Sequence, residues 1–340
     1  MQRNMKTWVS SLINSEKKPP IPILSFPCIQ LMGVTVQDMI SDSSLQARGM
    51  KAVADRVLSS AAVSLMDLSV EAECFGAKVR VSEDEVPTIV GAVVNDPEEA
   101  DSLVVPQIGA ARSGLYIKAI AEAVEMIQDR PVFAGVIGPF SLAGRLMDVS
   151  EAMIYCYEEP EMVHTAMEKA TTFVINYCKA YKEVGANGVM IAEPLAGLMS
   201  PALAREFAHP YVKQVIDAVQ DDYFAVIYHN CGDNVGLMAK DIYQLGAAGY
   251  HFGDAIHLAD VLPDAPEDAL VMGNISPSAE FRYGTPESME TAVRRVLDEC
   301  SGFPNFLVSS GCDVPPLTPW ENIDAFFTAA EKYGARNRGE

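Results

Sequence analysis

A histidine and a cysteine stand two residues apart in YHNCGDN (Tyr228 to Asn234), directly after a short apolar run. Side chains at positions i and i+2 of an extended chain lie on the same face, so His229 and Cys231 can approach one metal ion. The pair is weak evidence by itself, because cysteine is common in protein cores and histidine often satisfies a local hydrogen bond. A metal site therefore requires ligands from elsewhere in the chain.

Two further residues of suitable chemistry end other apolar runs. Cys312 closes NFLVSSGC, and Glu193 closes the apolar part of ANGVMIAEP. Zinc accepts cysteine, histidine and carboxylate ligands, and a catalytic zinc site keeps one of four positions open. We expect His229, Cys231 and Cys312 to hold Zn²⁺. Glu193 is expected to be catalytic, either as a fourth ligand that substrate displaces or as a nearby base.

Short apolar runs alternate along the chain with longer segments of helical periodicity, which is the pattern of a parallel sheet with crossover helices. Eight such runs predict an α/β fold of the (β/α)₈ TIM-barrel type, with the whole chain, 1–340, as one domain and 1–19 as an N-terminal helical extension. The predicted strands are 20–27, 61–68, 131–139, 186–194, 223–230, 247–254, 269–276 and 305–312. Amphipathic helices are predicted over 160–184, 289–297 and 322–333.

A barrel of this type carries its chemistry where the strands end, on the C-terminal face. Strands five and eight face each other across the barrel mouth, so Cys312 can join His229 and Cys231. Two more polar residues, Asp67 and Asn274, also lie at predicted strand ends. His251 lies in the sixth predicted strand and His257 follows it. Both could reach the mouth, and we interpret them as structural.

Composition excludes several classes of partner. The formal charge is 25 − 46 = −21, and no basic stripe is present, so nucleic acid and anionic membrane surfaces are disfavoured. The apolar runs are too short to span a bilayer. The seven scattered cysteines form no disulfide framework, and a cytoplasmic location is expected.

Four segments resemble the uroporphyrinogen decarboxylase superfamily, and the resemblance extends over about 20–334. They are AAVSLMDL with Asp67, GANGVMIAEPLAGLMSPALAREFAHPYVKQV with Glu193, MGNISP with Asn274, and SGCDVPPLTPWENIDAF with Cys312. The resemblance implies a (β/α)₈ barrel. Two departures separate the chain from the decarboxylase itself. The arginine-rich segment that holds that enzyme's substrate carboxylates has no counterpart in 25–39, and Cys312 replaces a histidine.

Both departures are shared by the cobamide-dependent methyltransferase branch, whose zinc motif is H-x-C followed by a distant cysteine. His229, Cys231 and Cys312 match that motif. The resemblance implies methyl transfer between a methylcobamide, a corrinoid carried on a corrinoid-binding protein, and a small thiol such as coenzyme M. Asp67 is then a candidate catalytic residue and Asn274 a candidate substrate-binding residue, both for orienting substrate or corrinoid.

The alternatives are a tetrapyrrole decarboxylase, a corrinoid-dependent enzyme with tetrahydrofolate as acceptor, and a non-catalytic partner of a corrinoid protein. The sequence leaves open the methyl acceptor, the direction of transfer and the oligomeric state.

Overall fold

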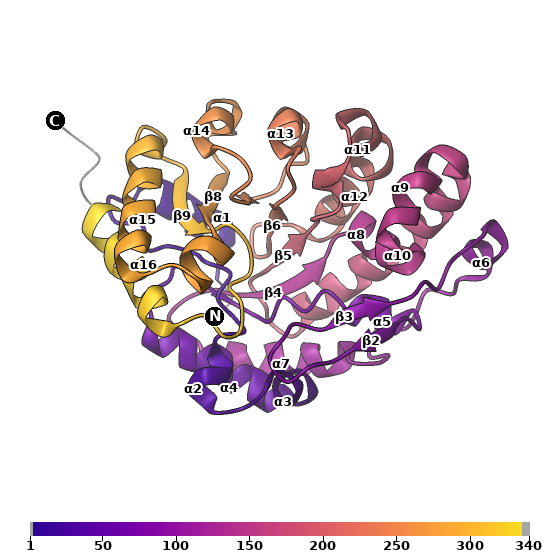
Figure 1. The fold of residues 1–340 in the computed structure, drawn as a ribbon, viewed down its shortest axis with the longest axis horizontal. Helices are drawn as coiled ribbons and strands as arrows, with labels where there is room; N and C mark the ends of the chain where they lie inside the picture. The colour runs from indigo at the N-terminus through magenta and orange to yellow at the C-terminus, as the bar shows by residue number, and fades with distance from the viewer. Residues whose placement is uncertain (1–2, 335–340) are drawn as a thin grey trace.

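The computed structural model describes residues 3–334 and has the predicted α/β, TIM-barrel-like fold (Figure 1). Seven parallel strands form one curled sheet in the order β1-β4-β5-β6-β7-β8-β9. Each strand pairs with its neighbour in parallel register, so all of the C-terminal ends lie at one edge. The strands are β1 (Ala62–Val63), β4 (Val132–Ile137), β5 (Gly188–Ala192), β6 (Ala225–Asn230), β7 (Gly249–Phe252), β8 (Leu270–Ile275) and β9 (Phe306–Ser310).

Helices form an outer layer around the strands. The three predicted helices are confirmed, as α10 (Pro160–Glu183), α15 (Pro286–Cys300) and α16 (Trp320–Gly334). The other long helices are α4 (Ser43–Arg56), α7 (Ser113–Met126), α8 (Pro139–Met147), α9 (Val149–Glu158), α12 (His209–Val219) and α13 (Val235–Tyr243). Short helices and turns are α2 (Cys28–Met32), α3 (Val36–Ser41), α5 (Val70–Cys74), α6 (Pro97–Ser102), α11 (Pro201–Phe207), α14 (Leu258–Val261), η1 (Ala196–Leu198), η2 (Leu262–Asp264) and η3 (Pro277–Arg282). None of the helices within 3–334 is both long and apolar enough to cross a bilayer.

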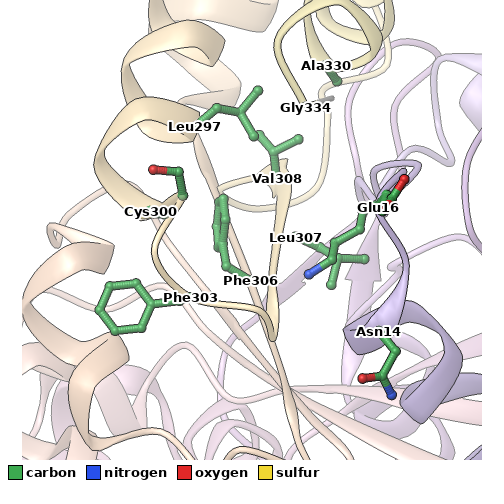
Figure 2. A pocket seen from close by; sticks show the side chains of 12 residues that line it. Asn14, Glu16, Leu297, Cys300, Phe303, Phe306, Leu307, Val308, Ala330 and Gly334 are labelled. Carbon is green, nitrogen blue, oxygen red and sulfur yellow. The ribbon is translucent and has the colours of Figure 1, made fainter. Parts of the chain in front are cut away.

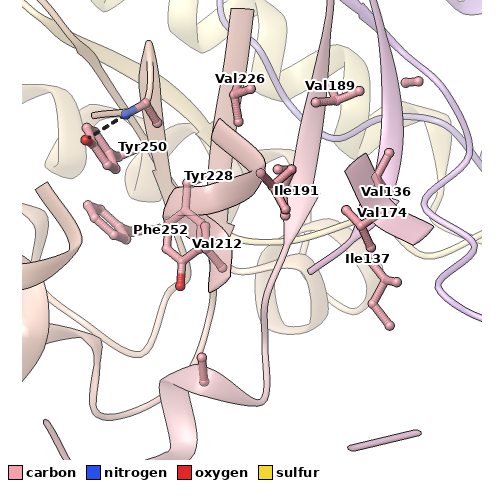
Figure 3. Packing of buried hydrophobic residues seen from close by; sticks show 14 of the residues in the cluster. Val136, Ile137, Val174, Val189, Ile191, Val212, Val226, Tyr228, Tyr250 and Phe252 are labelled. Atoms are coloured by element: carbon pink, nitrogen blue, oxygen red, sulfur yellow. Dashed lines mark hydrogen bonds between the residues drawn. The ribbon is translucent and has the colours of Figure 1, made fainter. Parts of the chain in front are cut away.

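Side chains alternate between the two faces of each strand, so the core consists of one cluster between the strands and the helices and a second cluster inside the barrel. In β6, Val226 and Tyr228 point outward and pack with Val212 of α12 (Figure 3). Ala225 and Ile227 point inward and belong to a second cluster inside the barrel. Because side chains alternate between faces, His229 follows Ile227 on the inner face.

The predicted N-terminal helix is present as α1 (Met5–Asn14), and it closes the barrel at the N-terminal ends of the strands. Met5 and Val9 join the inner cluster, and the Trp8 ring lies 5.8 Å from the Phe133 ring. Residues 1 and 2 of the expected extension lie outside the described residues. A cavity of about 350 Å³ lies at this closed end, between α1, the end of α15 and the start of β9 (Figure 2). It is therefore remote from the strand ends that carry the candidate ligands.

The prediction of a strand over 20–27 is wrong. Pro20 and Pro22 lack the N–H groups that a ladder requires, and the segment has no strand pairing. It is nevertheless buried between β9 and β1. The Ile23 N–H donates to the Ser310 hydroxyl (3.0 Å), and the Pro20 carbonyl accepts from the Ser60 N–H (3.0 Å). Side-chain and loop contacts thus replace the eighth strand's hydrogen bonds.

A long excursion, residues 69–110, follows β1 and lies along the outside of the barrel (Figure 1). It contains the antiparallel hairpin β2 (Lys78–Arg80) and β3 (Thr88–Val90), and then α6. Lys169 of α10 donates to the carbonyls of Ala100 and Asp101 of α6, both at 2.6 Å. These bonds fix the end of the excursion against the helical layer.

The closure of the barrel by α1 yields a stability prediction. Val9→Asp places an unpaired carboxylate in the inner cluster, and we expect it to lower the free energy of unfolding by about 3 kcal/mol or more. Ser10→Asp adds the same charge at the neighbouring exposed position and is the control. Urea unfolding measures both variants, and equal midpoints would show that α1 does not seal the barrel.

Candidate metal centre

Three residues from two distant segments meet at the C-terminal edge of the sheet. His229 ends the inner face of β6, Cys231 follows two residues later, and Cys312 follows β9. Their Nε2 and Sγ atoms all lie within 4.8 Å of one another, the one such ligand group found in the described part of the chain. His229 is buried, whereas both cysteines are half-buried. The predicted His-Cys-Cys set is therefore brought together.

The spacing of the donor atoms fits zinc. Zinc bonds of about 2.3 Å to sulfur and about 2.0 Å to nitrogen, at tetrahedral angles, separate two sulfurs by about 3.8 Å and a sulfur from a nitrogen by about 3.5 Å. The Cys231 and Cys312 sulfurs lie 3.9 Å apart, and His229 Nε2 lies 3.4 Å from Cys312 Sγ. Both distances match edges of a zinc tetrahedron, and the 3.9 Å separation excludes a disulfide. Three protein ligands leave one position for substrate.

Local sequence explains how Cys231 reaches the site. The Asn230 side chain faces away from the ligands, where its Nδ2 donates to the Tyr228 hydroxyl (2.9 Å). Its Oδ1 accepts from the Gly232 N–H (3.0 Å), which turns the chain directly after His229. A Cβ on Gly253 would lie 2.6 Å from both Cα and Cβ of Cys231. Glycine at position 253 therefore makes room for the ligand.

A hydrogen bond between the two thiols shifts their pKa values in opposite directions. Cys312 donates to the Cys231 sulfur, and this bond lowers the pKa of Cys231. The same bond, together with burial, raises the pKa of Cys312 to about 12. A divalent metal bound here would supply the charge that two thiolates need.

His251 is a site residue that we interpreted from sequence as structural. It is paired with His229 in the register of β6 and β7, and its side chain is fully buried. Its Nδ1 lies 2.8 Å from His229 Nδ1. The available signal was alternation, because Tyr250 and Phe252 pack outward and His251 must then point inward.

Glu193 lies near the centre but occupies a different position. Its carboxylate accepts from the N–H groups of Phe140 (3.0 Å) and Ser141 (2.6 Å) at the start of α8. Burial raises its pKa to about 7, against the lowering effect of these hydrogen bonds. In this conformation Glu193 is a helix cap and is outside the three-residue ligand group. Its expected role as ligand or base requires the side chain to leave α8.

Asp67 is enclosed by a hydrogen-bond network. Its Oδ2 accepts from Arg112 and from the Tyr116 hydroxyl (2.7 Å), and its Oδ1 accepts from the Ser69 N–H (3.1 Å) and hydroxyl. Arg112 also donates to Glu73 (2.7 Å). Both carboxylate oxygens therefore have protein donors, and the Asp67 side chain is 0% exposed.

Asn274 fixes the loop that follows β7. Its Nδ2 donates to the carbonyls of Gly253 (2.9 Å) and Ile256 (2.7 Å). Since Gly253 contacts Cys231, Asn274 supports the ligand loop through its backbone.

Comparisons with known proteins agree with this fold. The model of the family described as uroporphyrinogen decarboxylase (URO-D) matches residues 22–333. Methylcobamide:CoM methyltransferase MtbA of Methanosarcina acetivorans is 29% identical over 78% of both chains. MtaA of Methanosarcina barkeri is 26% identical over 79% of this chain and 78% of its own. Uroporphyrinogen decarboxylase of Chlorobaculum parvum is 27% identical over 71% of this chain and 72% of its own. The chain is therefore similar both to methylcobamide:CoM methyltransferases and to uroporphyrinogen decarboxylases.

Solved structures show the same architecture. A methyltransferase from Methanosarcina mazei matches with a TM-score of 0.86 and 22% identity, over 97% of this chain and 99% of that one. A B12-independent methionine synthase from a Shewanella species matches with a TM-score of 0.61 and 11% identity, over 94% of this chain and 95% of that one. At these identities the matches establish the fold alone, and the site must distinguish between functions.

The contact between Gly253 and Cys231 predicts a loss of metal affinity without loss of a ligand. In Gly253→Ala the new methyl group displaces Cys231, and we expect zinc affinity to fall at least about tenfold. Gly236→Ala is the control, because its Cβ meets only Ile256 at 3.8 Å. Competition with a chelating dye measures both affinities, and equal values would disprove the steric role of Gly253.

Proposed function

The chain belongs to the uroporphyrinogen decarboxylase family, and we propose that it is a zinc-dependent methyltransferase acting between a protein-bound methylcobamide and a small thiol. The observation that carries this proposal is the convergence of His229, Cys231 and Cys312 at the barrel mouth, with two donor separations that match edges of a zinc tetrahedron. The named similarity to methylcobamide:CoM methyltransferases supports it.

The ligand set suits activation of a thiol. A free thiol is a poor nucleophile at neutral pH because little of it is ionised. When bound to these three residues, Zn²⁺ would lower the pKa of an incoming thiol and keep its sulfur deprotonated. Cys231 and Cys312 as thiolates and His229 as neutral imidazole balance the charge of the ion. The protein thereby leaves the substrate sulfur electron-rich.

The reaction balances without another reagent. The thiol loses its proton, its sulfur forms a bond to the methyl carbon, and the carbon–cobalt bond breaks with its electron pair remaining on cobalt. Methyl-Co(III) thus becomes Co(I), and the thiol becomes a methyl thioether. The reverse reaction uses the same groups.

Apolar residues around the mouth suit a corrinoid that arrives on another protein. The segments that follow β5, β6, β8 and β9 expose large side chains, namely Leu198 at the end of η1 (50% exposed), Leu237 in the first turn of α13 (72%), Tyr283 after η3 (76%) and Leu317 (40%). Exposed apolar side chains gathered on one face are typical of an interaction surface. We infer that this rim contacts the corrinoid-binding protein.

The surroundings of Asp67 disfavour the decarboxylase alternative. Arg112 is engaged by Asp67 and Glu73, and 25–39 contains no arginine that could hold substrate carboxylates. The net charge of −21 also repels a polycarboxylate. The tetrahydrofolate alternative is disfavoured because a folate nitrogen makes less use of a zinc–thiolate site.

Loss of one ligand tests the proposed function directly. We expect the purified protein to contain about one zinc ion per chain. Cys312→Ser should lose most of the zinc and more than about 100-fold of thiol methylation, measured as the thiol-dependent absorbance change of methylcobalamin with coenzyme M. Cys156→Ser, at a buried cysteine of α9, should retain both properties. Full zinc content and full methylation in Cys312→Ser would refute the proposal, and uroporphyrinogen decarboxylation after chelation would favour the alternative.

The rim predicts a selective defect. Leu237→Asp should raise KM for a methylated corrinoid-binding protein by about tenfold or more and leave KM for free methylcobalamin unchanged. Leu58→Asp adds the same charge at a 66% exposed site before β1, at the opposite end of the barrel, and should change neither value. A parallel rise with both methyl donors would locate the effect in the active site.

A further inference from the structure

A continuous chain of buried polar groups lies behind the metal ligand His229. His229 Nδ1 lies 2.8 Å from His251 Nδ1 and 3.2 Å from the His251 carbonyl oxygen. His251 Nε2 lies 2.7 Å from the Ser309 hydroxyl, which lies 2.7 Å from the Ile21 carbonyl oxygen. The three side chains belong to residues at most 1% exposed. Solvent therefore does not reach these groups, and each N–H or O–H must find its acceptor within the network.

The direction of each hydrogen bond follows from the last acceptor. The Ile21 carbonyl can only accept, so the Ser309 hydroxyl donates to it. Ser309 Oγ then accepts the Nε2–H of His251. The two ring nitrogens of His251 face Ser309 and His229 in a fully buried space, where an uncharged ring is favoured. With its one proton on Nε2, His251 accepts the Nδ1–H of His229 at its own Nδ1. The neutral His229 ring is left with an unprotonated Nε2.

The opposite arrangement is unfavourable for a local reason. A proton on His229 Nε2 would leave two Nδ1 lone pairs facing each other at 2.8 Å in a buried space. It would also block the nitrogen that lies 3.4 Å from Cys312 Sγ. The network therefore favours the one tautomer of His229 that can bind a metal through Nε2.

We propose that His251 and Ser309 are positioning residues that fix the tautomer and orientation of His229 as a metal ligand. The proposal rests on the metal centre of the proposed function and not on the identity of the methyl acceptor. It also explains a feature of the fold. Ile21 lies in the proline-containing segment that forms no strand, and its carbonyl is consequently free to receive the Ser309 hydroxyl.

Two adjacent serines provide a matched test. Ser309 and Ser310 are both fully buried at the end of β9, and both hydroxyls bind the segment that contains Ile21 and Ile23. Only Ser309 contacts His251. We expect Ser309→Ala to weaken zinc binding about tenfold or more in dye competition, and Ser310→Ala to stay within about threefold of the unaltered protein. Equal weakening in both variants would overturn the proposal, because a general loss of packing would then explain it.

Variants of His251 distinguish the effect of its hydrogen-bond acceptor from the effect of its side-chain volume. His251→Leu removes the acceptor and should weaken zinc binding at least as much as Ser309→Ala. His251→Asn retains an acceptor at the Nδ1 position and should recover most of that affinity. Zinc binding by His251→Leu as tight as by the unaltered protein would overturn the proposal. If His251→Leu fails to fold, the serine pair decides.

Nitrogen NMR of the metal-free protein gives a readout independent of activity. We expect His229 to carry its proton on Nδ1, and a proton on Nε2 would overturn the proposal. Loss of thiol methylation with the expected zinc affinities intact would remove the proposed function and leave the positioning role standing. Failure of the unaltered protein to bind zinc would remove both.

Discussion

The structure depends on the convergence of the ends of β6 and β9 on one point above the barrel interior. Two sulfurs and one imidazole nitrogen must lie within 4.8 Å of one another although 83 residues separate His229 from Cys312. The parallel register brings both strand ends to the same edge, and alternation turns His229 inward. Inside the barrel, apolar side chains and α1 fill the space beneath the ligands. This packing supports the strand ends that carry the candidate ligands.

Much of this arrangement could be read from the sequence. Seven of eight predicted strands are present, because apolar runs between helical segments are the main determinant of a parallel sheet. The three candidate metal ligands could be predicted because each follows such a run and because together they match the H-x-C and distant-cysteine motif of the methyltransferase branch. The failure at 20–27 has a physical cause, since hydrophobicity marks a buried segment but two prolines prevent a ladder.

The surroundings of the ligands were less accessible to sequence analysis. Glu193 caps α8 because Gly138, directly before that helix, leaves room for the carboxylate, since a Cβ there would lie 2.3 Å from Glu193 Oε2. Asp67 is paired with Arg112, 45 residues away in the chain, and no local pattern reveals such a pair. The contact between His251 and His229 depends on register across two strands. Sequence periodicity identifies which face a residue occupies but not its partner on that face.

The charge distribution gives a reason for a cation at this centre. Asp233, Asp254 and Asp313 surround the two cysteines. The hydrogen bond from Cys312 lowers the pKa of Cys231 although Asp254 and Asp233 oppose that shift, and burial together with Cys312 raises the pKa of Asp313 well above its usual range. Two thiolates among these carboxyl groups would repel one another and their surroundings. A divalent cation held by His229, Cys231 and Cys312 would offset this repulsion. The same acidic surroundings would oppose a polycarboxylate tetrapyrrole. These acidic groups thus support the proposed metal centre, in a family that also includes uroporphyrinogen decarboxylases.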